Sequence, residues 1–205
     1  MEKDTLNNII ESAKSAPDTS SAIQSIIKGL QKQWGFECIA IRIKNDFGDY
    51  PYFAYLGFSD DFAEAENTLC EKDETGKIKR DTAGNPALEC MCGNILQERF
   101  DPSLPFFTKN GSFWTNSTTK LLASTSEKDR QSRTRNRCNG EGYESVGLFP
   151  LKFKGMMIGL MQLNDHKKNM FSDKNIEEYE LVANYLAETV CYSIVIKDKK
   201  IYGNL

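Results

Sequence analysis

The chain has 205 residues, of which 40% are hydrophobic and 27% are charged, and its formal net charge is −3. This composition argues against wholesale disorder, and the acidic balance argues against a nucleic-acid-binding protein, which usually presents a basic face. No apolar run approaches the roughly 18 residues of a membrane span, and the polar N-terminus is unlike a signal peptide. We therefore expect a single cytoplasmic domain over residues 1–205 that binds neither nucleic acid nor a membrane.

The first part of the chain predicts helices followed by a β-hairpin. Helical spacing recurs over residues 6–13 and 19–34, and Gly35 stands where a C-terminal glycine cap is expected. Residues 36–43 and 50–58 are rich in β-branched and aromatic residues and flank a turn at residues 45–49. This pattern predicts two paired strands. A short helix is expected from Ser59, with acidic residues in its first turn.

Residues 67–110 show little regular pattern, although three of the six cysteines lie there. Long irregular segments in compact domains are usually functional or disordered, and the cysteines favour a functional loop. A short strand at residues 111–115 and a brief helix at residues 118–126 are expected next. A basic segment follows, which contains Arg133, Arg135 and Arg137.

The last part of the chain predicts a hairpin and a long helix. Strands are expected at residues 143–151, ending near Pro150, and at residues 156–163. A final helix begins at Ser172 or Asp173, and its apolar side chains have the 3,4 spacing of a coiled-coil seam at Ile176, Tyr179, Ala183, Leu186 and Val190. We therefore expect this helix to pack on its own sheet and also on a partner helix, in a homodimer formed through the terminal helices. Antiparallel hairpins with helices gathered at one face predict an α+β fold.

Six strings of residues carry a family resemblance: Cys90-Met-Cys-Gly93, Phe106-Phe-Thr, Gly111-Ser-Phe-Trp-Thr-Asn116, Arg135-Asn-Arg-Cys138, Gly142-Tyr-Glu-Ser-Val146 and Ile158-Gly-Leu-Met-Gln-Leu-Asn-Asp165. Together they resemble the GAF domain, in particular a cysteine-bearing subgroup found in sensor histidine kinases and related signal-transduction proteins. The resemblance covers about residues 19–187. It implies an antiparallel sheet flanked by helices, a ligand pocket under a long cysteine-containing loop, dimerisation through terminal helices, and a histidine kinase or other signalling partner.

Four cysteines, Cys70, Cys90, Cys92 and Cys138, lie in predicted loops beside turns and charges. Four thiolates can ligate zinc or an iron–sulfur cluster, and Arg133, Arg135 and Arg137 can offset the negative charge of such a site. The same arginines would lower the pKa of Cys138 and make it a reactive thiolate. A metal centre, a thiol redox switch and ordinary loop cysteines therefore all stay open. Cys38 and Cys191 are expected to be buried small hydrophobes.

Candidates for a ligand pocket are Phe113, Trp114, Asn116 and Tyr143, although core packing explains them equally well. His166, the only histidine, lies in a polar turn, and we do not expect it to bind haem, whose axial ligand needs an apolar pocket. The leading interpretation is a non-enzymatic sensory domain. It would bind a small ligand or a cysteine-ligated metal or iron–sulfur cluster, and report redox state or oxygen through its terminal helices. The alternatives are a thiol-based reductase of the methionine sulfoxide type and a ligand-free dimerisation module.

Overall fold

The computed structural model describes residues 8–9, 11, 16–131 and 134–197, with residues 192–197 described by their backbone alone. A five-stranded sheet forms the centre of the fold. Its strands are β1 (Cys38–Ile43), β2 (Tyr52–Leu56), β3 (Phe113–Thr115), β4 (Ser145–Phe153) and β5 (Met156–Asp165). Their spatial order is β2-β1-β5-β4-β3, and every neighbouring pair is antiparallel.

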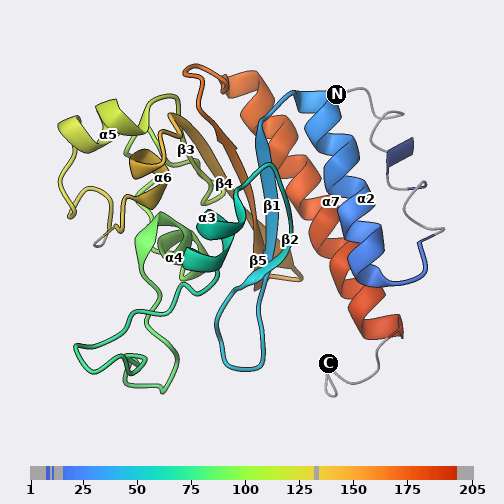
Figure 1. The fold of residues 1–205 in the computed structure, drawn as a ribbon, viewed down its shortest axis with the longest axis horizontal. Helices are drawn as coiled ribbons and strands as arrows, with labels where there is room; N and C mark the ends of the chain where they lie inside the picture. Colours follow the sequence, from blue (N-terminus) through green and yellow to red (C-terminus); the bar gives the residue numbers. More distant parts are fainter. Residues whose placement is uncertain (1–7, 10, 12–15, 132–133, 198–205) are drawn as a thin grey trace.

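Helices cover both faces of this sheet (Figure 1). The long helices α2 (Thr19–Trp34) and α7 (Asp173–Lys197) pack side by side on one face, which we call the helical face. The other face, which we call the pocket face, is covered by α3 (Asp60–Ala65), α4 (Cys90–Leu96), α5 (Thr118–Ser124) and α6 (Arg137–Gly140). The α+β prediction is confirmed, but the expected gathering of helices at one face holds only for the long pair.

Local sequence explains where α2 begins and ends. The Asp18 carboxylate accepts a hydrogen bond from the backbone N–H of Ser21 at 2.8 Å, which satisfies a donor that the first turn leaves free. Gly35 ends the helix with a φ of 73°, and its N–H donates to the carbonyl of Gln31. A left-handed residue at this position favours glycine, as the sequence predicted. The helix expected around residues 6–13 lies largely outside the described residues.

Strand β4 runs beyond the end predicted for it. It continues through Pro150 to Phe153, because β3 pairs only with residues 146–148 and leaves the following part of β4 without a neighbour on that side. Proline lacks the N–H that a central strand needs, so it is tolerated where one side of the strand is unpaired.

The segment over residues 67–110 is more ordered than its sequence pattern indicated. Isolated β-bridges join Cys70 to Leu88, Lys72 to Ile78 and Arg80 to Pro86, and α4 follows at once. This helix is too short to show a clear period. It packs closely, since a Cβ at Gly93 would lie 2.8 Å from the backbone of Leu88. Cys90, Cys92 and Cys138 therefore stand in short helices and not in the loops predicted for them.

The apolar stripe of α7 is used within the domain. The predicted seam residues pack against the sheet and α2, and each is at most 5% exposed: Ile176, Tyr179, Ala183, Leu186 and Val190. The outward stripe has the same spacing but is mostly polar, with Leu181 55% exposed among Lys174, Glu177, Asn184 and Glu188. The predicted seam is thus unavailable to a partner helix. Within the described ranges, no helix combines the length and apolarity that crossing a membrane requires.

Candidate functional site

Three of the four predicted ligand cysteines line one small cavity on the pocket face, which we call the thiol pocket. Cys90 and Cys92 come from α4 and Cys138 from α6, while Val146 and Leu148 of β4 line it from the sheet. The cavity holds only about 60 Å³ of open space. Pockets for ordinary organic ligands span about 300–1,000 Å³, so the thiol pocket has room for an ion or a few atoms.

Cys70 lies apart from these three cysteines. It lines a separate open depression with Glu71, Glu89 and Arg135. Burial and, to a smaller extent, the Asp49 carboxylate raise the pKa of its thiol to about 11. Within the part of the chain that the structure describes, no group of three or more His, Cys, Asp or Glu side chains is arranged to hold a metal ion. The expected set of four cysteines is therefore not assembled around one point in this structure.

The buried thiols of the pocket are poor acids. Burial raises the pKa of Cys92 to about 12. Part of Cys138 reaches solvent, but burial of its thiol, together with Cys90 and Cys92 nearby, raises its pKa well above the usual 9.0. The expectation that neighbouring arginines lower the pKa of Cys138 is thus wrong in direction, because loss of hydration outweighs them. Both groups are neutral thiols at pH 7.

Two of the three predicted arginines are described: Arg137 lines the thiol pocket, and Arg135 lines the depression that contains Cys70. Arg135 pairs through Nη2 with Glu66 Oε2 at 3.1 Å, and it is close enough to Cys92 for its positive charge to lower the pKa of that thiol in part. Arg137 lines the thiol pocket and pairs with Glu141 at 2.8 Å. Arg133 falls outside the described residues. The site therefore has the positive charge that the sequence suggested, although both arginines form ion pairs with carboxylates.

Arg42 is a further charged group that the sequence did not single out. It is fully buried on β1, and it donates to the carbonyls of Tyr50 at 2.9 Å and Glu66 at 2.7 Å. Its guanidinium also lies 3.6 Å from the centre of the Tyr52 ring. The sequence signal for this residue was an arginine between two isoleucines in a strand predicted to have one buried face, since buried charges require partners.

Several buried N–H donors around the thiol pocket have no hydrogen-bond partner in the described part of the chain. They are the Nε atoms of Arg42, Arg130, Arg135 and Arg137. Arg130 and Arg137 line the pocket directly, whereas the charges of Arg42 and Arg135 act on the Cys92 thiol. A buried unpaired donor costs about 1–3 kcal/mol, so these groups indicate a place for an acceptor.

Two residues that line this pocket have a left-handed backbone conformation. Cys90 has a φ of 67° and Asn136 a φ of 58°, and both residues line the cavity. Asparagine tolerates the left-handed region, but cysteine rarely adopts it. Such conformations cluster at binding and catalytic sites, where the surrounding structure holds them in place.

The four predicted ligand-pocket residues do not share one cavity. Phe113 lines the thiol pocket, whereas Trp114 and Asn116 line a second and larger pocket. Tyr143 is a core residue that packs against Phe58 and Phe62, and its hydroxyl accepts a hydrogen bond from the Cys38 thiol at 3.4 Å. Tyr143 is therefore a core residue, as one of the two interpretations proposed, and the other three residues line two separate pockets.

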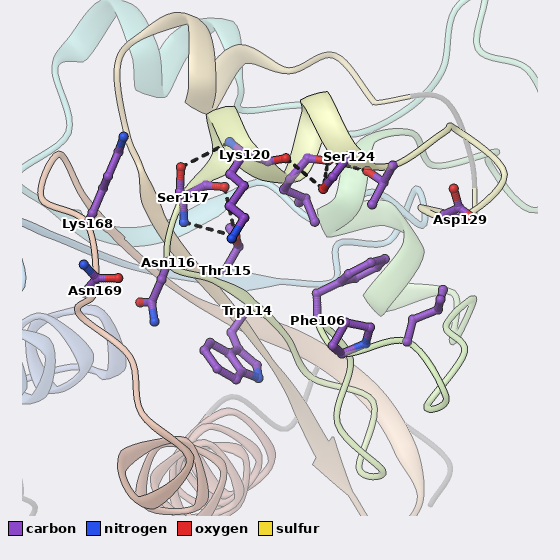
Figure 2. A pocket seen from close by; sticks show the side chains of 14 residues that line it. Phe106, Trp114, Thr115, Asn116, Ser117, Lys120, Ser124, Asp129, Lys168 and Asn169 are labelled. Atoms are coloured by element: carbon purple, nitrogen blue, oxygen red, sulfur yellow. Dashed lines mark hydrogen bonds between the residues drawn. The ribbon is translucent and has the colours of Figure 1, made fainter.

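The second pocket, which we call the edge pocket, lies beside the outer edge of β3 and measures about 740 Å³ (Figure 2). Trp114 approaches it from β3 and Asn116 from the residue that follows this strand, Lys120 from α5, and Lys168 and Asn169 from the segment before α7. Its size matches that of pockets for small organic molecules. Leu121 lines both pockets, so α5 separates the two.

His166 has partners for both ring nitrogens at the protein surface. Nδ1 lies 2.6 Å from Glu37 Oε2 and Nε2 lies 3.0 Å from the carbonyl oxygen of Glu141. The hydrogen bond to Glu37 raises the pKa of the imidazole. The half-exposed imidazole thus forms a surface ion pair with Glu37 when it is protonated.

Comparison with known proteins identifies the fold. No protein-family model and no curated protein matches the chain. Among solved structures, the GAF domain of a phosphoenolpyruvate-protein phosphotransferase from Coxiella burnetii is 13% identical with a TM-score of 0.65, covering 95% of each chain. A domain of a two-component sensor histidine kinase protein from Sinorhizobium meliloti is 13% identical with a TM-score of 0.54, covering 95% of this chain and 96% of that one.

An enzyme has the same architecture. Free methionine-R-sulfoxide reductase from Neisseria meningitidis, in complex with its substrate, is 11% identical with a TM-score of 0.59, covering 92% of this chain and 87% of that one. The chain therefore has the GAF fold, which signalling domains and this reductase share.

Proposed function

Because the fold is that of GAF domains, we propose that this chain is a cytoplasmic sensory domain that holds a thiolate-bound metal centre in the thiol pocket. The centre would be zinc or an iron–sulfur cluster, and an iron–sulfur cluster would report redox state or oxygen. One observation carries the proposal. Thiols from two segments far apart in sequence, α4 and α6, line a cavity with room for only a few atoms.

The surroundings of the pocket suit an anionic group. Metal-bound cysteines are thiolates, so Cys90, Cys92 and Cys138 would hold the centre, and Cys92 and Cys138 would lose their protons when it binds. The resulting negative charge and sulfur acceptors match the buried, unpaired N–H groups of Arg130 and Arg137. When bound, zinc would supply a structural crosslink, whereas an iron–sulfur cluster would supply one-electron redox chemistry.

A chain of contacts connects the thiol pocket to α7. Phe113 lines the pocket, and the preceding Ser112 donates its hydroxyl to Glu180 of α7 at 2.7 Å. Thr108 donates to the same carboxylate at 2.6 Å. A change in the pocket that moves Phe113 would therefore act on α7. In a homodimer, the exposed stripe around Leu181 would form the contact with the partner helix, and a histidine kinase or other signalling protein would receive the signal.

The test is metal analysis of protein purified without oxygen. We expect iron with acid-labile sulfide, or one zinc per chain, and loss of the metal in Cys138→Ser. Cys70→Ser and Cys191→Ser are matched controls, since Cys70 lines another depression and Cys191 lies in the helical-face core. Protein that never binds metal, or a Cys138→Ser variant that keeps its full content, contradicts the proposal.

The second candidate is a thiol reductase, which the clustering of Cys90, Cys92 and Cys138 favours. Cys138 would attack the sulfoxide sulfur of free methionine sulfoxide, and Cys90 or Cys92 would then close a disulfide. Two thiols are oxidised, the sulfoxide is reduced to a thioether, and its oxygen leaves as water. The raised pKa of Cys138 opposes this role, because the attacking species is the thiolate. An assay coupled to thioredoxin that shows no turnover excludes it.

A further inference from the structure

The edge pocket has one apolar wall. Leu104, Pro105 and Phe106 form one side, Leu121 contributes from α5, and the half-buried ring of Trp114 faces the same space. Apolar surface that is gathered in a concave site favours a ligand with an apolar or aromatic body.

Most acceptors and hydroxyls around this pocket are already engaged. The Asp129 carboxylate accepts from the N–H and the hydroxyl of Ser126, both at 2.7 Å. The hydroxyls of Ser124 and Thr125 donate to carbonyls of α5 at 2.8 Å and 2.6 Å. The Asn116 amide bonds the backbone of Phe171 in both directions. These groups hold the pocket together and offer little to a ligand.

The polar groups that remain are two lysine amines, the Asn169 side chain and the second carboxylate oxygen of Asp129. The Lys120 side chain extends from α5 into the pocket, and its Nζ makes no hydrogen bond or ion pair within the described residues (Figure 2). Lys168 reaches the pocket from the opposite side and has only a long contact of 3.6 Å to Glu144, with 55% of its side chain exposed. Two amines on facing segments beside an apolar wall select a ligand by charge.

We propose that the edge pocket is a binding site for a small organic anion, with an aromatic or branched apolar body and a carboxylate or comparable acidic group. The body packs on Trp114 and Phe106, and the acidic group lies between Lys120 and Lys168. This site is separate from the thiol pocket and does not depend on a metal centre there.

A ligand in the edge pocket would contact residues that are hydrogen-bonded to the segment leading into α7. Asn169 lines the pocket with a φ of 64°, and its N–H donates to the carbonyl of Asn116 at 3.3 Å. Asn116 in turn holds Phe171, which lies just before α7. A ligand between Lys120 and Lys168 thus bridges α5 and the segment that leads into this helix.

The test uses naphthalene-1-acetate as the probe and the uncharged naphthalene-1-acetamide as its matched control. The chain has two tryptophans, so two indole N–H signals report on the protein in a nitrogen-15 NMR titration. We expect the acetate to shift the signal of Trp114 saturably. The signal of Trp34, whose Nε1 donates to Glu178 at 2.8 Å on the helical face, should move much less. The acetamide should bind at least tenfold more weakly.

The double variant Lys120→Gln/Lys168→Gln should lose at least tenfold in affinity for the acetate, whereas Lys152→Gln, which removes a lysine paired with Glu98 elsewhere, should not. Equal binding of acetate and acetamide, an unshifted Trp114 signal, or full affinity in the double variant overturns the proposal. The titration is repeated on Cys138→Ser, where retained binding shows that this site stands whether or not the thiol pocket holds a metal.

Discussion

The two faces of the sheet differ in the kinds of side chain that they bury. On the helical face, side chains of β1, β4 and β5 meet α2 and α7 in a continuous apolar cluster that includes Phe149, Leu163 and Leu186. The pocket face also has an apolar cluster, but the buried charged groups Arg42, Glu66 and Arg130 and three thiols adjoin it. Burial of charge is costly, so the difference indicates that stability comes mainly from one face and binding from the other.

The difference extends to the backbone. Helical-face elements are long and regular, and α2 has well-formed caps at both ends. The pocket face has short helices, and two residues of the thiol pocket, Cys90 and Asn136, adopt left-handed conformations. Strain of this kind persists only where the surrounding structure holds it in place.

The largest effect is expected for Phe149→Ala on the helical face. Phe149 is fully buried and meets Tyr179 edge to face at a centroid distance of 5.5 Å. Removing its ring leaves a cavity, so the free energy of unfolding should fall by about 3–5 kcal/mol in urea denaturation. Phe47→Ala is the control, because that ring is 76% exposed and should cost little. Similar losses in both variants would show that Phe149 is not a stabilising centre.

A smaller effect is expected where the two faces are joined. Glu180 of α7 accepts hydrogen bonds from Thr108, Asn110 and Ser112, each at 2.6–2.7 Å. Glu180→Gln keeps one acceptor oxygen but loses the charge, so we expect a loss of about 1–2 kcal/mol, since hydrogen bonds to charged groups are the stronger ones. The amide protons of residues 111–114 should also exchange faster with solvent.

The matched control for this change is Glu177→Gln, because Glu177 is exposed one turn earlier on α7 and forms no hydrogen bond or ion pair within the described ranges. It should leave stability and exchange at residues 111–114 unchanged. If Glu180→Gln destabilises the protein without faster exchange at those residues, the carboxylate does not hold the turn to the helix.

The helical face could be predicted from sequence more fully than the pocket face. Long periodic stretches such as residues 19–34 determine their buried side, and the caps at Asp18 and Gly35 mark the helix ends. The same kind of pattern is ambiguous in one respect. The 3,4 spacing of Ile176 and Leu186 does not say whether a sheet or a partner helix covers these side chains. Here the domain's own sheet covers it.

The pocket face is set by contacts between distant segments. Cys138 lines the same cavity as Cys90 and Cys92 only because the fold brings α6 and α4 together there, and no local pattern encodes that arrangement. Cys70 has the same local character as the other three and yet lies elsewhere. Direct inspection of residue types found the cysteines and arginines, whereas their grouping, and the burial of Arg42, required the fold.

The smallest effect concerns a surface pair at the rim of the pocket face, and it depends on pH. The pKa of His166 is raised in the folded protein, chiefly by its hydrogen bond with Glu37. The pair therefore stabilises the fold fully below the unfolded imidazole pKa of about 6.5, and this contribution is lost as pH rises through the higher folded value. Both side chains are nearly half exposed, so the effect should stay below about 1 kcal/mol.

Urea denaturation of the wild type and Glu37→Gln at pH 5.5 and pH 8.5 measures this contribution. The wild type should be more stable than the variant at pH 5.5, and the difference should shrink at pH 8.5 and in high salt. Glu141→Gln is the control for pH dependence, because His166 contacts only the backbone carbonyl of Glu141, and Arg137, which pairs with its carboxylate, stays charged at both pH values. A difference that grows with rising pH would show that the fold stabilises the neutral imidazole, and that the ion pair does not add to the free energy of unfolding.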